Sequence, residues 1–283
     1  MEIFQLNRGS GIMKKIFLFV AFVLTVSVAG AWTKSIDEAV VIVANEHLTP
    51  AAKKMVKKYL GKSFEDDVQY LYNVEREKAK TMSKKARAAA GEIHLVHLDS
   101  NCQPKSVKGK DALKATEAAL AIIGNYKSHS KAEVTEALRT VINLMCDMHN
   151  LSKARIDGIP HSMRNFTYQI PNGEYGREKE QLSKQLKWPQ TWDVFDGGFK
   201  HFTPNYWAMD LRAYIGNKYE EYSKGSLREW VVDNGKLSAH YYGIFKPKSV
   251  VSYWDRKWAL PVSYDMVAKA SCRLAALLNE TIK

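Results

Sequence analysis

Cysteine is scarce in this chain of 283 residues, which contains only Cys102, Cys146 and Cys272. Because the number is odd, at least one thiol is free or pairs with another molecule. Cys146 and Cys272 lie within apolar helical patterns, which favours buried thiols that pack as small hydrophobic groups. A scheme in which disulfides pair every cysteine within one chain is therefore excluded.

Internal repeats, low-complexity segments and long linkers are also absent from the sequence. Nothing divides residues 32–283, so we expect them to form a single domain. No G-x-S-x-G motif is present to support a hydrolase with a serine nucleophile. The apolar share of 46% is ordinary for a globular protein, so disorder is not expected.

Acidic residues are too few to balance the basic ones. Aspartate and glutamate number 30 against 42 lysines and arginines, which gives a formal net charge of +12. A surface of this charge favours nucleic acid, phospholipid headgroups or acidic polymers as partners. The alternative is a solvated basic surface with no partner.

The start of the chain resembles a cleavable signal peptide over residues 14–31. Two lysines precede an apolar run at 16–28, and Ala-Gly-Ala at 29–31 is a small-x-small cleavage site. The run is short for a spanning helix, and the cleavage site follows at once. We therefore predict translation from Met13, export to the periplasm or outside the cell, and Trp32 as the new N-terminus.

Helical spacing of apolar residues recurs along most of the chain, so we predict an all-α fold. Thr49-Pro50 should start a helix that ends at Gly61, and Thr203-Pro204 should start another. A last helix is expected over 261–282. The segment 152–202 reads as a long irregular middle, with a strand suggested by the alternation of Phe166, Tyr168 and Ile170.

The central predicted helix covers residues 133–149. Its apolar positions share one face, which consists of Val134, Leu138, Val141, Met145 and Met148. A second stripe is polar and consists of Glu136, Thr140, Asn143 and Asp147. We interpret this stripe as lining a buried polar site, although such a stripe can also face water.

Several segments together resemble the secreted zinc-dependent single-strand nucleases of the S-one and P-one type, which share their fold with bacterial phospholipase C. The segments are ANEHLTPAAKKMVKKYLG, GEIHLVHLD, EALRTVINLMCDMHNL, Trp192-Asp193 and RLAALLNE. Their order and spacing extend the resemblance over nearly the whole mature chain. The resemblance implies a single nuclease-like helical domain, and endonucleolytic hydrolysis of nucleic acid as the parent activity.

The resemblance also implies a cluster of three zinc ions that activate a hydroxide. Positions that keep a ligand type in this chain are Trp32, Glu38 (or its neighbour Asp37), His94, Asp147 and Asp193. Positions at which the ligand is lost are Asn73, Asn143, Lys153 and Pro189. Asparagine is a poor zinc ligand, proline offers none, and a charged lysine repels the ion.

We therefore expect a non-catalytic or strongly altered relative that binds single-stranded nucleic acid or another anionic polymer as a monomer and holds at most one zinc ion. The alternative is an active phosphoesterase with a reduced metal site centred on Trp32. A third hypothesis, a hydrolase rebuilt on the unplaced histidines, has less support because no two of them share an i, i+4 spacing.

The surviving residues also have simpler interpretations. Asp147 could pair with a base such as Lys153 or Arg155, His94 could be a core histidine, and Asp193 could cap a turn. At Lys153 the resemblance implies a lost zinc ligand whose ion Asp193 also held. We predict that the Lys153 ammonium takes the place of this ion beside Asp193, with Arg155 as the second choice of partner.

Overall fold

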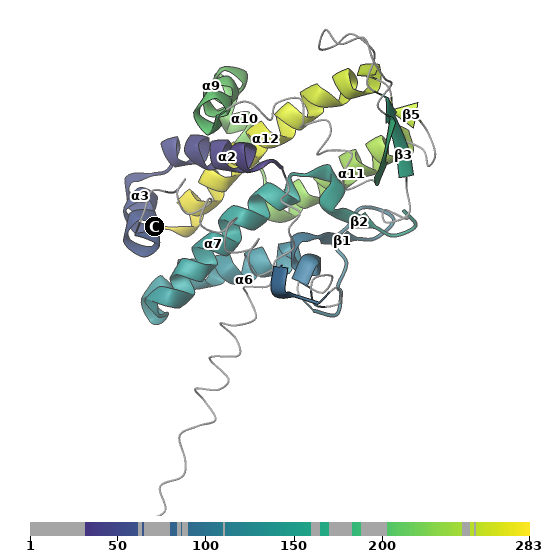
Figure 1. The fold of residues 1–283 in the computed structure, drawn as a ribbon. Coiled ribbons are helices and arrows are strands. Elements are labelled where there is room, and N and C mark those ends of the chain that lie inside the picture. Colours follow the sequence, from purple (N-terminus) through teal and green to yellow (C-terminus); the bar gives the residue numbers. More distant parts are fainter. Residues whose placement is uncertain are drawn as a thin grey trace, which may run out of the picture.

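The fold is mostly helical, which confirms the all-α prediction (Figure 1). A computed structural model describes residues 32–61, 64, 80–83, 86, 90–109, 111–159, 165–169, 183–187, 203–244, 250–251 and 253–283. The predicted signal peptide, Asn73, Pro189 and Asp193 lie outside these ranges. No helix within them is long and apolar enough to cross a bilayer.

The described residues form helices, 3-10 turns (η) and short strands in the following order along the chain. They are α2 (Lys34–Glu46), α3 (Pro50–Leu60), η1 (Glu92–His94), β1 (Val96–Leu98), α6 (Ala112–Gly124), η2 (Tyr126–Ser128), α7 (Lys131–Met148), η3 (Leu151–Lys153), β2 (Ala154–Ile156), β3 (Asn165–Gln169), β4 (Ser183–Lys187), α9 (Pro204–Ile215), α10 (Tyr219–Ser223), α11 (Leu227–Ile244), β5 (Val250–Val251) and α12 (Tyr253–Thr281).

Helix α12 runs through the middle of the molecule. Figure 1 shows α2 and α9 on one side of it and α7 and α6 on the other, and residues of α12 contact all four helices. Helices α6 and α7 form an antiparallel pair joined by η2. The core therefore lies where α2, α7 and α12 meet.

The boundaries of α3 follow the sequence signals. The Thr49 hydroxyl accepts a hydrogen bond from the Ala52 amide at 3.3 Å, Pro50 occupies the first turn, and Gly61 ends the helix with a φ of +69°. A left-handed φ of this kind favours glycine. The predicted start and end of this helix are confirmed.

Helix α7 begins with a capping box that fixes its register. The Glu133 amide donates to the Ser130 hydroxyl at 3.2 Å, and the Ser130 amide donates to the Glu133 carboxylate at 2.8 Å. All five residues of the predicted apolar face are buried. The polar stripe is half-exposed along most of the helix and becomes buried only at Asp147. The predicted buried polar site is thus confined to the last turn.

Two short parallel strands bring distant segments of the chain to this last turn. Strands β1 and β2 pair with Val96 opposite Ala154. His94 closes η1 just before β1, and Lys153 closes η3 just before β2. The pairing therefore places both side chains near the C-terminal end of α7.

The remaining strands and the last helix test two further predictions. Strand β3 lies between β4 and β5, which confirms strand structure at Phe166 and Tyr168. The predicted start of the last helix at Pro261 is wrong, because α12 already begins at Tyr253 and Pro261 stands inside it. Proline has no amide hydrogen and favours the first turn, but an established helix can continue through it at the loss of one backbone hydrogen bond.

Two glycines on α11 provide a matched test of core packing. A Cβ atom at Gly235 would overlap Leu98 Cδ1 and lie 3.4 Å from Cys102 Cβ, whereas a Cβ atom at Gly243 meets nothing within 4 Å. We expect Gly235→Ala to lower the free energy of unfolding by about 1–3 kcal/mol, because it overpacks a buried site. Gly243→Ala should be neutral, or stabilising by up to about 1 kcal/mol. Urea unfolding measures both, and equal effects would contradict the packing described here.

Candidate functional site

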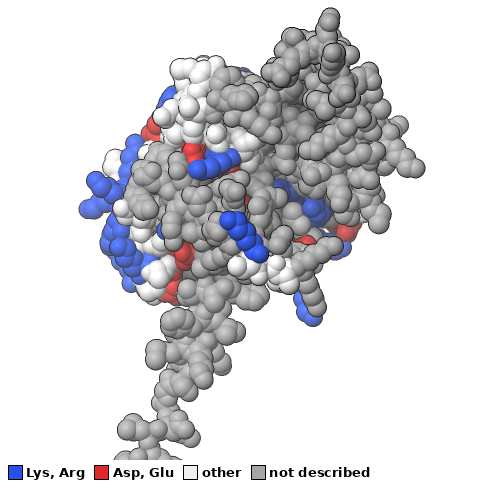
Figure 2. Space-filling view, viewed as in Figure 1, with Lys and Arg blue, Asp and Glu red and all other residues white. Residues whose placement is uncertain are grey.

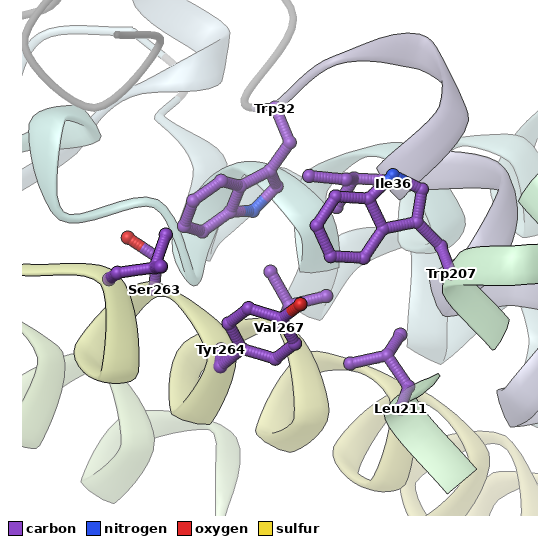
Figure 3. A pocket seen from close by; sticks show the side chains of 8 residues that line it. Trp32, Ile36, Trp207, Leu211, Ser263, Tyr264 and Val267 are labelled. Carbon is purple, nitrogen blue, oxygen red and sulfur yellow. The ribbon is translucent and has the colours of Figure 1, made fainter. Parts of the chain in front are cut away.

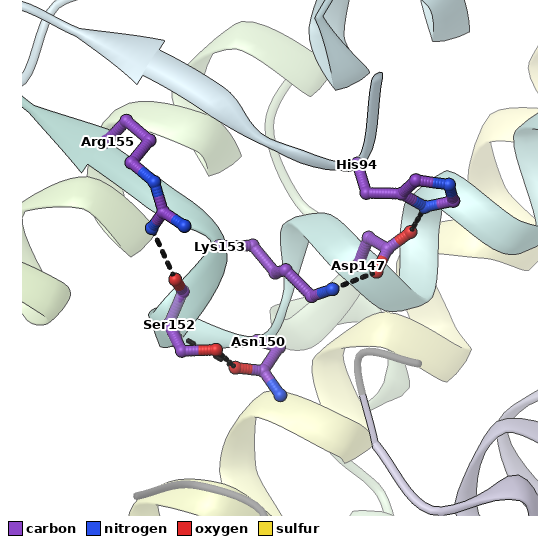
Figure 4. Close-up of polar contacts among 6 residues, drawn as sticks. All are labelled: His94, Asp147, Asn150, Ser152, Lys153 and Arg155. Atoms are coloured by element: carbon purple, nitrogen blue, oxygen red, sulfur yellow. Dashed lines mark hydrogen bonds and ion pairs between the residues drawn. The ribbon is translucent and has the colours of Figure 1, made fainter. Parts of the chain in front are cut away.

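A buried trio of charged and polar side chains lies at the C-terminal end of α7 (Figure 4). The Asp147 carboxylate is 1% exposed. One of its oxygens, Oδ2, lies 2.6 Å from His94 Nδ1, and the other, Oδ1, lies 3.2 Å from Lys153 Nζ. We call this group the Asp147 centre.

A tight turn after α7 directs Lys153 back to Asp147. The Asn150 side chain accepts hydrogen bonds from the Ser152 amide at 2.9 Å and from the Ser152 hydroxyl at 2.7 Å. An asparagine that bonds the backbone two residues on stabilises this kind of turn. The turn starts η3, and Lys153 is the last residue of η3.

Helix α11 holds the same turn from the other side. Asn234 Nδ2 donates to the Met148 carbonyl at 3.0 Å, and the Ser238 hydroxyl donates to the Leu151 carbonyl at 2.6 Å. Both side chains are buried, so these bonds replace hydrogen bonds that water would otherwise make. The position of Lys153 is therefore set by both local and long-range contacts.

The charge of Asp147 is balanced within the protein. Burial alone would raise the pKa of Asp147, but the positive charge of Lys153 and the contact with His94 outweigh it, so its pKa lies below the ordinary value. The carboxylate is consequently ionised at neutral pH, with the Lys153 ammonium as a counter-charge. One of the simpler interpretations of Asp147, pairing with Lys153, is confirmed.

His94 keeps one ring nitrogen available. Nδ1 contacts the carboxylate, so in a neutral ring with its proton on Nδ1 the Nε2 atom would carry the lone pair. Nε2 is buried and has no hydrogen-bond partner among the residues that the structure describes. Such a nitrogen can accept a proton or bind a metal ion.

Two predicted residues near the N-terminal end of the domain are also buried. Glu38 is buried on α2, and its carboxylate lies 3.6 Å from Lys34 Nζ. Trp32 is buried, and its indole Nε1 has no hydrogen-bond partner in the described part of the chain. Figure 3 shows the Trp32 ring in an apolar pocket between α2, α9 and α12, which is lined by Ile36, Trp207, Leu211, Leu260, Ser263, Tyr264 and Val267.

The described residues do not form the donor set of a zinc cluster. Within the described ranges, no three or more histidine, cysteine, aspartate or glutamate side chains are grouped so that they could hold a metal ion. His94 and Asp147 are brought together, but the cation beside Asp147 is Lys153. Asp193 lies outside the described ranges, so its predicted pairing with Lys153 stays a prediction.

A second cluster of buried polar side chains joins the end of α7 to α12, and the sequence did not predict it. The Met145 carbonyl accepts a hydrogen bond from His149 Nδ1 at 2.8 Å. Arg273 Nη1 donates a hydrogen bond to His149 Nε2 at 3.1 Å. Arg273 also donates to the Tyr222 carbonyl and lies 5.1 Å from the centre of the Trp230 ring. An arginine directly before the apolar run LAALL of the last helix was the available signal.

Burial lowers the pKa of His149 to about 3, with the nearby charge of Arg273 as the second cause. Burial likewise lowers the pKa of Arg273 to about 10. The histidine is therefore neutral and the arginine charged at pH 7. This arrangement is structural, because both ring nitrogens of His149 and the Nε and Nη1 atoms of Arg273 are used by protein partners.

The three cysteines are free and buried. Burial raises the pKa of the Cys146 thiol well above its ordinary value, with the nearby Asp37 carboxylate as a further cause. A buried thiol with a raised pKa is a poor nucleophile. The predicted role of Cys146 and Cys272 as small packing groups is confirmed.

No model of a known protein family matches the sequence, and no curated protein matches it either. The geometry of the Asp147 centre, the charge of the chain and the motifs of its sequence are therefore the features that point to a function.

Proposed function

We propose that this protein is an exported, monomeric, non-catalytic relative of the zinc-dependent single-strand nucleases, and that it binds single-stranded nucleic acid or another anionic polymer. The observation that carries the proposal is the buried contact between Lys153 and Asp147. The resemblance implies that Asp147 is shared by two of the zinc ions. An ammonium 3.2 Å from this carboxylate supplies the counter-charge of a metal ion and repels a divalent cation.

The consequence for catalysis follows from charge. Phosphodiester hydrolysis by a metal cluster needs ions that stabilise both the attacking and the leaving oxygen. A single ammonium held by Asp147 can do neither for a substrate, since it is 9% exposed and already paired. The basic surface remains, and its net charge favours a polyanion as the partner.

Metal content tests the proposal directly. We expect elemental analysis of the purified protein to find at most one zinc ion per chain. Labelled single-stranded DNA should bind, as followed by fluorescence anisotropy, and remain uncut after prolonged incubation with zinc. Two or three tightly held ions together with cleavage would contradict the proposal.

The alternative, an active phosphoesterase with one metal ion near Trp32, draws support from the buried carboxylates of Glu38 and Asp147. It requires one tightly bound zinc ion and DNA cleavage. Both should then be lost in Glu38→Gln, a change that keeps the size of the side chain but removes its charge. Cleavage that Glu38→Gln does not reduce would exclude this alternative.

A further inference from the structure

Helix α3 carries a strongly basic surface. Lys53, Lys54, Lys57 and Lys58 are all exposed, and no acidic residue occurs in this helix. At 100° per residue the four side chains share one face, and the opposite face, with Met55, Val56 and Tyr59 among its members, is buried. Figure 2 shows blue side chains gathered along the left edge of the molecule, where α3 lies in Figure 1.

A neighbouring segment adds a fifth lysine. Lys58 Nζ lies 5.0 Å from the centre of the Tyr59 ring, and Lys127 Nζ lies 5.9 Å from the centre of the Tyr126 ring. The two rings are 6.1 Å apart in an edge-to-face arrangement. These contacts connect α3 to η2, so Lys127 borders the same surface. We call these five residues the α3 lysine surface.

Ion pairs within the described ranges do not balance the charges of this surface. Within the described part of the chain, Lys54, Lys57 and Lys58 make no ion pair, and Lys53 Nζ donates to the carbonyl of Glu46 rather than to its carboxylate. The Glu46 carboxylate itself binds Arg212. Repulsion among adjacent ammonium groups is relieved when they contact a polyanion.

We propose that the α3 lysine surface binds the phosphate backbone of nucleic acid, at a place separate from the Asp147 centre. This inference rests on the proposed function and specifies where the partner binds. Lysine contacts phosphate as a point charge, and Tyr59, the aromatic residue of α3, is buried rather than exposed for base stacking. Binding is therefore independent of base sequence.

The geometry favours nucleic acid over a lipid surface. A helix that binds a membrane inserts its apolar face into the bilayer, but the apolar face of α3 is packed in the protein core. The large exposed hydrophobic residues of the described ranges lie on α9 instead, at Tyr206, Met209 and Tyr214. The α3 lysine surface thus offers charge without apolar anchors.

The test replaces Lys53, Lys54, Lys57 and Lys58 together with glutamine in the mature protein. Because the four side chains are exposed, circular dichroism and thermal unfolding should match the wild type. Binding to a labelled 20-nucleotide oligonucleotide should weaken on the order of 100-fold at 100 mM salt. The plot of the log of the binding constant against log salt concentration should become shallower by about 3, since each phosphate contact on a single strand contributes about 0.7 to its steepness.

A matched control removes the same charge elsewhere. Lys108, Lys218, Lys224 and Lys236 are exposed and lie on other segments, and their replacement with glutamine should change the affinity less than threefold. Equal losses in the two variants, or no loss in the α3 variant, would overturn the inference while leaving the proposed function intact. Wild-type protein that binds phosphatidylserine vesicles but no oligonucleotide would overturn both.

Discussion

Replacing Lys153 with methionine should lower the free energy of unfolding by about 3–5 kcal/mol, the usual result of removing one partner of a buried ion pair. Methionine fills a similar volume but leaves the Asp147 carboxylate without its positive partner. Among the residues that the structure describes, His94 would then be the remaining partner of the carboxylate, at a distance of 2.6 Å. Urea unfolding at pH 7 measures the change.

Two further variants make this result specific. Lys105 pairs with Asp157 at 2.7 Å, but both side chains are about half exposed, so Lys105→Met should cost at most about 1 kcal/mol. Combining Lys153→Met with Asp147→Asn should recover most of the stability, because no unpaired buried carboxylate then remains at this centre. A cost below about 1 kcal/mol for Lys153→Met alone would show that the pair contributes little.

Lys153→His should not restore zinc by itself, because Pro189 offers no ligand.

Acid should destabilise the protein through His149. The pKa of this residue is about 3 in the folded state, against an ordinary value of 6.5. The unfolded chain therefore binds a proton below pH 6.5 that the folded protein does not, and stability falls with pH from 6.5 toward 3. At about 1.4 kcal/mol per pH unit, the loss between pH 7.5 and pH 4.5 is about 3 kcal/mol.

Variants of two histidines separate this contribution from other titrating groups. His149→Gln removes the titration and keeps an amide that can donate and accept, so the variant should lose about 3 kcal/mol less than the wild type between these pH values. His240, which is exposed on α11, serves as the control, and His240→Gln should keep the wild-type pH dependence. An unchanged pH dependence in His149→Gln would contradict the buried, neutral histidine.

Local sequence signals predicted much of the helical framework. Thr49, Pro50 and Gly61 define the ends of α3 because each acts through the backbone of its own turn. The buried face of α7 followed from spacing alone, since an i, i+3, i+4 pattern needs no knowledge of the partner helices. The start of α12 was missed because a proline at the first turn and one inside a helix look the same in a sequence.

The candidate site was predicted less completely because its contacts depend on turns and on pairing between distant segments. His94 and Asp147 were both identified as candidates, and the structure brings them together. The contact of Lys153 with Asp147 appeared only as an alternative, because the direction of Lys153 is set by the Asn150 turn and by α11. The role of Arg273 depends on His149, which is far away in the sequence.

The Asp147 centre also has a consequence for the order in which the chain folds. Lys153 follows Asp147 by less than two helical turns, so their contact closes a very short loop, whereas His94 must arrive through the pairing of β1 with β2. Short loops close at a lower entropic cost and on a faster timescale than long ones. The lysine can thus neutralise the carboxylate before the distant strand docks, and the growing core never has to enclose a bare negative charge.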